Sequence, residues 1–290
     1  MQLESDLLTE LAISQCNIKN IDQLCLKNLQ ILVIHQNPGF QIRNLAKFNN
    51  LKELDLSQNI LNDISCLQPL TQLTRLCLRE NKIHDISVLQ YLTNLRELNV
   101  SSNFELVITP VQYCKRLTKL DMSSTNIRNI EALQSLINLE DLNLSFNIFI
   151  DLSPIMDMQK LKKLNASWTE VINFQVLPSL TQLKELDISF SENKDRHMTH
   201  FQYMIQLTKL SMYSNKLQST QVLSQLYVNL KQLDISDNMN VDIESLQNLT
   251  SLTHLTMFKC GIKSLIPIQL NWKNYNFKIM KQQVCLHQRI

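Results

Sequence analysis

The chain has 290 residues, 44% of them hydrophobic, and its 28 basic residues are nearly balanced by 26 acidic ones. Proteins that bind polyanions usually concentrate Lys and Arg on one face, so this balance argues against a nucleic-acid partner. Only two glycines occur, Gly39 and Gly261, which argues against glycine-rich phosphate-binding loops. No run of about 18 apolar residues is present, so we expect no membrane span.

The cysteines and the first residues indicate the cellular compartment. The chain contains seven cysteines, an odd number, and no CxxC pair, which favours reduced thiols over a disulfide framework. The opening residues, MQLESDLLTEL, lack the basic and apolar regions of a signal peptide. We therefore expect a cytoplasmic or nuclear protein.

One pattern, LxxLxLxxNxIxxIxxLxxLxx, recurs along the whole chain and sets the expected elements. Successive copies begin 21 to 24 residues apart, most often 22. The twelve copies begin at Leu8, Leu29, Leu51, Leu73, Leu95, Leu117, Leu139, Leu161, Leu183, Leu207, Leu230 and Leu252. Self-similarity at such a period is typical of a solenoid, in which each copy forms one coil.

Each part of the pattern predicts a local structure. The alternating leucines of LxxLxL predict a short strand with one apolar side, and stacking of these strands predicts a parallel sheet. The later apolar residues, such as Ile83, Ile86 and Leu89, recur with a period near three, which predicts short 3₁₀ or irregular turns on the convex side. We therefore predict an α/β solenoid of about twelve coils over residues 1–270, with a tail at 271–290 as a candidate cap.

The ninth position of most coils is Asn, whose side-chain amide can bond the buried backbone of neighbouring coils. This expected Asn ladder consists of Asn37, Asn59, Asn81, Asn103, Asn147, Asn215 and Asn238. Small residues replace Asn in the other coils, namely Cys16, Thr125, Thr169, Ser191 and Cys260. The two cysteines at this position are therefore interpreted as structural residues.

The segments NDISCLQPLTQL (62–73) and HDISVLQYLTNL (84–95) resemble the short, 22-residue class of leucine-rich repeat proteins. That class includes the regulatory repeat subunit of type 1 protein phosphatases and the bacterial internalins. The resemblance covers about residues 8–270 and implies a right-handed solenoid whose concave sheet grips other proteins. It does not select one partner, because such coils host many unrelated tasks. The terminal caps usual in those two groups are not recognised in this sequence.

If the leucines face inward, residues at the third, fifth, seventh and eighth positions of each coil should face outward. Charges at the third position alternate in sign from Glu53 to Lys209. Strands in register would pair these side chains, each pair contributing about 0.2 to 1 kcal/mol. The alternative interpretation is a charge pattern that is read by a partner.

Large aromatic residues at the rim of successive coils predict a partner-binding site. They are not needed for the core, and leaving one exposed forgoes about 1.5 to 3 kcal/mol of burial. Together with nearby acidic residues they have the composition of an interface centre. The predicted site comprises Phe146, Trp168, Phe190, Tyr213, Phe258, Asp141, Glu185, Asp187 and Asp234. The alternative is that the aromatic rings fold over an adjacent loop.

The coil that begins at Leu183 is longer than its neighbours and carries SENKDRHMTHF (191–201), which predicts a projecting polar loop. His197 and His200 in this loop lie three residues apart. A zinc site needs at least three protein ligands, and no further ligand lies at a suitable spacing. We therefore expect no metal and no other cofactor.

The sequence contains no GxSxG, HExxH or P-loop pattern, so we do not expect an enzyme. The leading hypothesis is a scaffold or regulatory subunit that holds a folded partner on the concave face, with a protein phosphatase suggested by the resemblance. The alternative is a surface or secreted adhesin similar to internalins. A third hypothesis is the substrate-recognition subunit of a multi-chain enzyme. The oligomeric state is left open.

Overall fold

The computed structural model describes residues 3–191 and 195–262. The chain divides into two compact units, Met1–Gln182 and Leu183–Ile290. The tail at 271–290, proposed above as a cap, lies outside the described residues. Each unit is described by itself.

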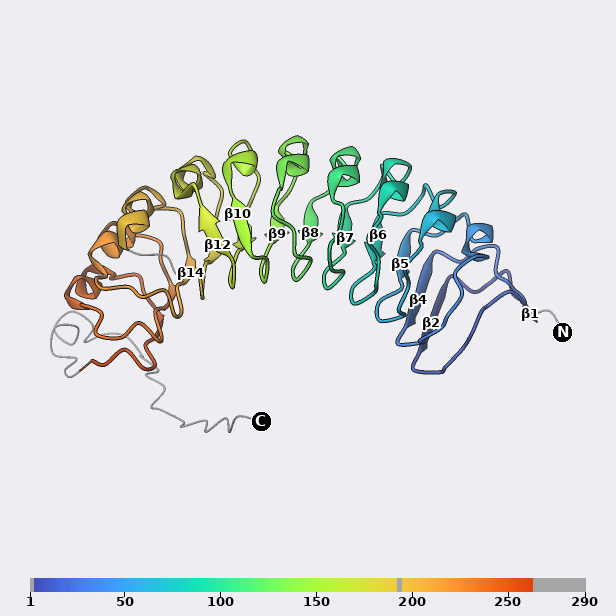
Figure 1. Ribbon diagram of the computed structural model, residues 1–290, viewed down its shortest axis with the longest axis horizontal. Coiled ribbons are helices and arrows are strands. Elements are labelled where there is room, and N and C mark those ends of the chain that lie inside the picture. Colours follow the sequence, from blue (N-terminus) through green and yellow to red (C-terminus); the bar gives the residue numbers. More distant parts are fainter. Residues whose placement is uncertain (1–2, 192–194, 263–290) are drawn as a thin grey trace. The chain divides into compact units, whose positions relative to one another are not determined.

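The first unit is a parallel sheet whose strands follow one another in chain order, with 3₁₀ segments between them (Figure 1). Residues at the same repeat position lie opposite each other, as Leu54 does to Leu76. The strands of the sheet are β2 (Glu10–Ser14), β4 (Ile31–His35), β5 (Glu53–Asp55), β6 (Arg75–Cys77), β7 (Glu97–Asn99), β8 (Lys119–Asp121), β9 (Asp141–Asn143) and β11 (Lys163–Asn165). The 3₁₀ segments are η1 (Leu45–Lys47), η2 (Ser65–Leu67), η3 (Ser87–Gln90), η4 (Thr109–Tyr113), η5 (Glu131–Ser135), η6 (Ser153–Ile155) and η7 (Phe174–Ser179).

Two smaller parallel pairs lie outside this sheet. They are β1 (Leu3–Glu4) with β3 (Leu24–Cys25), and β10 (Phe149–Asp151) with β12 (Glu170–Ile172). In Figure 1 the sheet of the first unit lies on the inner side of its curve and the 3₁₀ segments on the outer side.

The second unit repeats the same architecture. Its strands are β13 (Glu185–Asp187), β14 (Lys209–Ser211), β15 (Gln232–Asp234) and β16 (His254–Thr256), which pair in parallel and in chain order. Its 3₁₀ segments are η8 (Asp195–Tyr203), η9 (Gln221–Leu226) and η10 (Glu244–Asn248). The predicted coil of parallel strands and short 3₁₀ segments is thus confirmed.

The repeat leucines form the core. Leu51, Leu56 and Leu144 are fully buried, as the alternating pattern requires. One detail of the expected register is wrong, because most of the seventh-position serines are buried rather than exposed. In the coil that begins at Leu139, for example, the Ser145 hydroxyl turns back and donates to Asn143 Oδ1 at 2.8 Å.

Buried Asn side chains join consecutive coils at the end of each strand. The Asn59 amide Nδ2 donates to the carbonyl oxygens of Ile34, at 2.6 Å, and of Leu56, at 2.8 Å. Its Oδ1 accepts the Asn37 N–H at 2.9 Å. In a coil without Asn, the Thr125 hydroxyl donates to the Met122 carbonyl at 2.7 Å and so replaces part of this pattern. The ladder supplies hydrogen bonds to backbone groups that have no access to water.

The polar insertion of the coil at Leu183 contains η8, a nine-residue 3₁₀ segment. The His197 side chain lies outside the described residues, so the two-histidine arrangement is not defined. Over the described part of the chain, no cluster of three His, Cys, Asp or Glu side chains suits a metal ion. The same residues include no helix that is long and apolar enough to span a bilayer.

The thiols differ in their environment, and this difference predicts their reactivity. Burial raises the pKa of Cys77 to about 11 and that of Cys114 to about 12, whereas Cys16 is exposed. Because the thiolate is the reacting form, we expect a maleimide to label Cys16 rapidly at neutral pH, and Cys77 and Cys114 much more slowly. Peptide mass spectrometry of the native and the unfolded chain would measure this. Equal rates for Cys16 and Cys114 in the native chain would contradict the expected environment.

Candidate functional site

Two aromatic side chains of the first unit stack on each other at the end of the strands. The ring centroids of Phe146 and Trp168 are 5.5 Å apart and their planes are 10° from parallel. Phe146 is 55% exposed and Trp168 48% exposed, so neither ring is covered by an adjacent loop. Phe146 follows strand β9 and Trp168 follows β11, and β9 and β11 are hydrogen-bonded neighbours. The two rings therefore form one apolar surface on adjacent coils.

Both aromatic residues have a left-handed backbone, with φ of 58° at Phe146 and 55° at Trp168. The same conformation occurs at the eighth position of all twelve coils, namely at Gln15, Gln36, Gln58, Glu80, Ser102, Ser124, Phe146, Trp168, Phe190, Ser214, Asp237 and Lys259. This turn lets the chain leave the strand, and the Phe146 N–H donates to the Ser167 carbonyl at 2.9 Å. A bulky side chain is unfavourable in this conformation, which costs about 1 to 2 kcal/mol per residue. An aromatic residue here is therefore not explained by the needs of the turn.

A second aromatic pair lies in the second unit. The ring centroids of Phe190 and Tyr213 are 4.7 Å apart with a tilt of 42°, and both side chains are partly exposed. Burial raises the pKa of the Tyr213 hydroxyl, and the carboxylates of Asp237 and Asp234 raise it further. Phe258 is also partly exposed, and its N–H donates to the Ser236 hydroxyl at 3.0 Å.

The acidic residues of the predicted site lie within the framework of the coils. Asp187 and Asp234 each accept the N–H of the serine two residues later, at 2.9 Å, and so close the turn after the strand. Asp141 lies opposite Lys119 with 4.0 Å between Oδ2 and Nζ, and Glu185 lies opposite Lys209 in the strand register. These carboxylates thus hold the surface beside the aromatic rings in place.

The third-position charges of the first unit form the cross-strand pairs that the sequence predicts. Arg75 lies between two carboxylates, 3.5 Å from Glu53 and 3.6 Å from Glu97. These side chains are well exposed, so each pair contributes little, about 0 to 1 kcal/mol. The pairing supports the interpretation of a self-satisfied charge ladder rather than a pattern read by a partner.

The sequence reasoning missed two apolar neighbours of the aromatic pair. Ile148 and Phe149 follow the buried Asn147 in the same turn, and both are exposed. The sequence signal was weak, because NIFI (147–150) is apolar after the ladder position but only six of the twelve coils have a polar residue there. Together with Phe146 and Trp168, these residues make up what we call the aromatic site.

The edge beside the aromatic site is held by a network around Asp151. Its carboxylate accepts the Ser153 N–H and the Asn173 amide, both at 2.7 Å. Burial alone would raise the pKa of Asp151, but the hydrogen bonds from Ser153 and Asn173 outweigh it and hold the pKa below its ordinary value. Asp151 and Asn173 belong to neighbouring coils, so the charged carboxylate joins the coils that carry Phe146 and Trp168.

Comparison with known proteins gives a repeat family and a shared fold. The family model described as leucine rich repeats (2 copies) matches residues 71–109. No curated protein matches the chain significantly. The internalin InlF of Listeria monocytogenes is similar in structure, with 24% identity and a TM-score of 0.76 over 95% of this chain and 88% of that one.

Two other solved structures share the fold at lower identity. A leucine-rich repeat protein of Leptospira interrogans is 20% identical, with a TM-score of 0.59 over 89% of this chain and 82% of that one. The plant peptide hormone receptor RGFR1, in complex with RGF2, is 18% identical, with a TM-score of 0.59 over 89% of this chain and 49% of that one. At these identities the similarity shows the fold alone. The family match over residues 71–109 and the coil architecture together show a leucine-rich repeat fold.

Proposed function

We propose that this protein is a non-catalytic interaction scaffold that binds a folded protein partner through the aromatic site. The observation that carries the proposal is the stacked, exposed pair of Phe146 and Trp168 on a left-handed backbone. Leucine-rich repeat proteins generally act in protein–protein interaction, which supports the same class of function.

Phe146 and Trp168 combine two energetically unfavourable features, a left-handed backbone and an exposed aromatic ring. The turn would form more easily with a small residue, such as the serines at the same position of neighbouring coils. The rings also leave apolar surface in water that burial against a partner would remove. Exposed aromatic residues of this kind, grouped with aliphatic neighbours, are the usual anchors of protein interfaces.

The identity of the partner, the biological role and the cellular location of the protein are each proposed on a different observation. A protein phosphatase as the partner, and a regulatory role, are supported only by the repeat form of the sequence. A location in the cytoplasm or nucleus is supported by the cysteine usage. The alternative of an internalin-like adhesin is supported by the fold shared with the Listeria internalin.

The test is a double substitution at the aromatic site, Phe146→Asn with Trp168→Asn. Asn tolerates the left-handed backbone, so the relief of about 1 to 2 kcal/mol per residue offsets the loss of about 0.5 to 1.5 kcal/mol of ring stacking and of about 1 kcal/mol of burial at each half-exposed ring. We therefore expect an almost unchanged thermal unfolding midpoint. Affinity capture from native extract, followed by quantitative mass spectrometry, should show that the variant loses the main partner of the wild type by about tenfold or more.

The matched control replaces Tyr91 and Tyr113, two exposed aromatic residues of the convex segments, with Asn. This control should capture the same partner as the wild type. If the aromatic-site variant captured the partner as well as the wild type does, the site would be removed from the proposal. If both the variant and the control lost the partner, the contacts would be nonspecific aromatic ones.

A further inference from the structure

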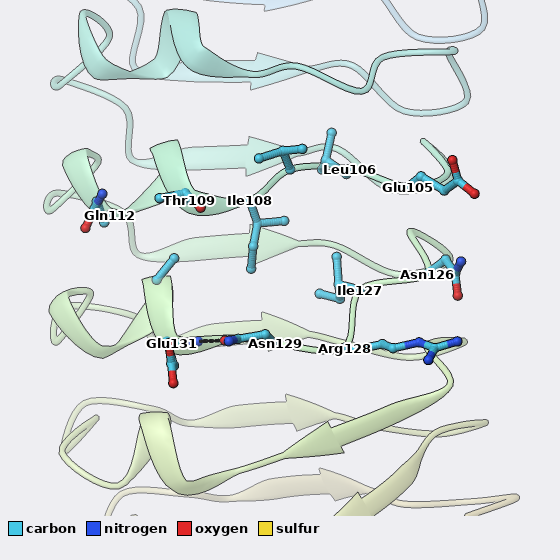
Figure 2. A pocket seen from close by; sticks show the side chains of 12 residues that line it. Glu105, Leu106, Ile108, Thr109, Gln112, Asn126, Ile127, Arg128, Asn129 and Glu131 are labelled. Carbon is cyan, nitrogen blue, oxygen red and sulfur yellow. Dashed lines mark hydrogen bonds between the residues drawn. The ribbon is translucent and has the colours of Figure 1, made fainter.

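A groove of about 600 Å³ opens between two coils of the first unit, on the edge where the strands end. Figure 2 shows Leu106, Ile108 and Ile127 along its middle. Glu105 and Arg128 lie at one end of the groove, and Glu131 lies at the other (Figure 2). The middle side chains are almost completely buried, whereas Glu105 and Glu131 are exposed. The groove thus has an apolar floor with a carboxylate at each end.

The groove exists because the backbone hydrogen bonds that join successive coils along this edge are interrupted. Val107 donates its N–H to the His84 carbonyl at 2.9 Å and so bonds the preceding coil. Further along the edge, β10 and β12 pair directly. Within residues 3–191, no backbone hydrogen bond joins 106–108 to 127–129, and the two coils leave a gap there.

The opposite edge of the same unit, where the strands begin, carries the reverse charge. We call it the basic patch and define it as Arg96, Lys115, Arg116, Lys160 and Lys162, all exposed. Glu140, which pairs with Lys162 at 2.6 Å, is an acidic residue beside them. The near balance of charge in the whole chain therefore conceals a local excess of basic residues on this edge.

An exposed aliphatic residue lies in the centre of the basic patch. Ile137 is 54% exposed and occupies the same repeat position as Lys115 in the preceding coil. The adjacent Asn138 donates to the Lys115 carbonyl at 3.0 Å and accepts from Lys160 Nζ at 2.7 Å. The second bond fixes the Lys160 ammonium beside Ile137, and the first fixes the backbone that carries Lys115.

The basic patch and the groove are complementary in charge, and each has an aliphatic part. One presents an aliphatic side chain between two lysines, and the other presents an aliphatic floor between two carboxylates. The single cation of the groove, Arg128, has a counterpart in Glu140, beside the patch. We propose that the basic patch of one copy of this chain docks on the groove of a second copy, with Ile137 on the apolar floor.

Because the two surfaces differ, the contact is head-to-tail and can add further copies beyond a pair. The flanking ion pairs lie at exposed positions, so added salt should weaken the contact. This self-association is independent of the partner bound at the aromatic site, because the groove lies on other coils and the basic patch lies at the opposite ends of the strands.

The experiment compares charge-reversal variants of the full chain by sedimentation velocity over a range of concentrations in low salt. The first variant is Lys115→Glu with Lys160→Glu, and the second is Glu105→Lys with Glu131→Lys. We expect the wild type to associate and each variant alone to bind itself about tenfold or more weakly. An equimolar mixture of the two variants should associate again, because the reversed patch then meets the reversed groove.

Two controls separate the proposed contact from nonspecific charge effects. Lys184→Glu with Lys231→Glu changes the net charge of the chain as the first variant does, but lies in the second unit and should associate like the wild type. Ile137→Ser keeps every charge and should still weaken association. A wild-type chain that stays monomeric at all concentrations in low salt, a mixture that fails to associate, or a charge control as weak as the first variant would overturn the proposal.

Discussion

Replacing Leu144 with aspartate is expected to unfold the centre of the first unit. Leu144 is fully buried at the strand position that faces the core. An unpaired carboxylate placed there has no partner and no water, which costs about 4 kcal/mol or more. Since a coil is stabilised mainly by its neighbours, the loss should spread to the adjacent coils. Urea unfolding followed by circular dichroism would measure the change in the free energy of unfolding.

The same substitution at an exposed aliphatic residue of the same coil, Ile148→Asp, serves as the matched control. It introduces the same charge without burying it, and its free energy of unfolding should stay close to that of the parent. If Leu144→Asp unfolded at the same urea concentration as this control, the assignment of Leu144 to the core would be wrong.

Replacing Asn59 with leucine is expected to give the second large loss of stability. The Asn59 side chain donates to three backbone carbonyls and accepts the N–H of Asn37. Leucine has a similar volume but can form none of these bonds, so buried backbone groups of adjacent coils lose their partners. Each unsatisfied group costs about 1 to 3 kcal/mol, and we expect a total destabilisation of about 3 kcal/mol or more. The measurement is again the free energy of unfolding in urea.

The chain itself offers the control, because Thr125 occupies the equivalent position in another coil. Thr125 both donates to a backbone carbonyl and lies within hydrogen-bond distance of Asn147 Oδ1. Asn59→Thr should therefore lose roughly half as much stability as Asn59→Leu, since a hydroxyl keeps part of the hydrogen bonding. Equal losses in the two variants would show that side-chain volume, and not hydrogen bonding, determines the effect.

Most of the fold could be predicted because each coil is specified locally. The alternation of leucines in LKELDL (51–56) fixes which side chains of that strand face the core, and every later coil has the same pattern of apolar positions. The buried seventh-position serines could not be inferred from alternation. Ser145 turns inward because a hydrogen bond to Asn143 and a left-handed residue at the next position bend the chain away from the strand.

The candidate site could be predicted only in part. The rim position of Phe146 and Trp168 follows from the repeat register, but their stacking and left-handed backbone require coordinates. The basic patch was missed because residues were counted along the chain rather than by repeat position. Lys115 and Lys160 lie before strands and Glu105 lies after one, a distinction that a charge total cannot show.

The left-handed residue at the eighth position of each coil has a consequence for how such surfaces change over time. Its backbone is the same whether the side chain is serine, glutamate or tryptophan, so a substitution there alters what the molecule displays without altering the path of the chain. Recognition at this position can therefore diversify coil by coil, while the interior that supports it stays constant.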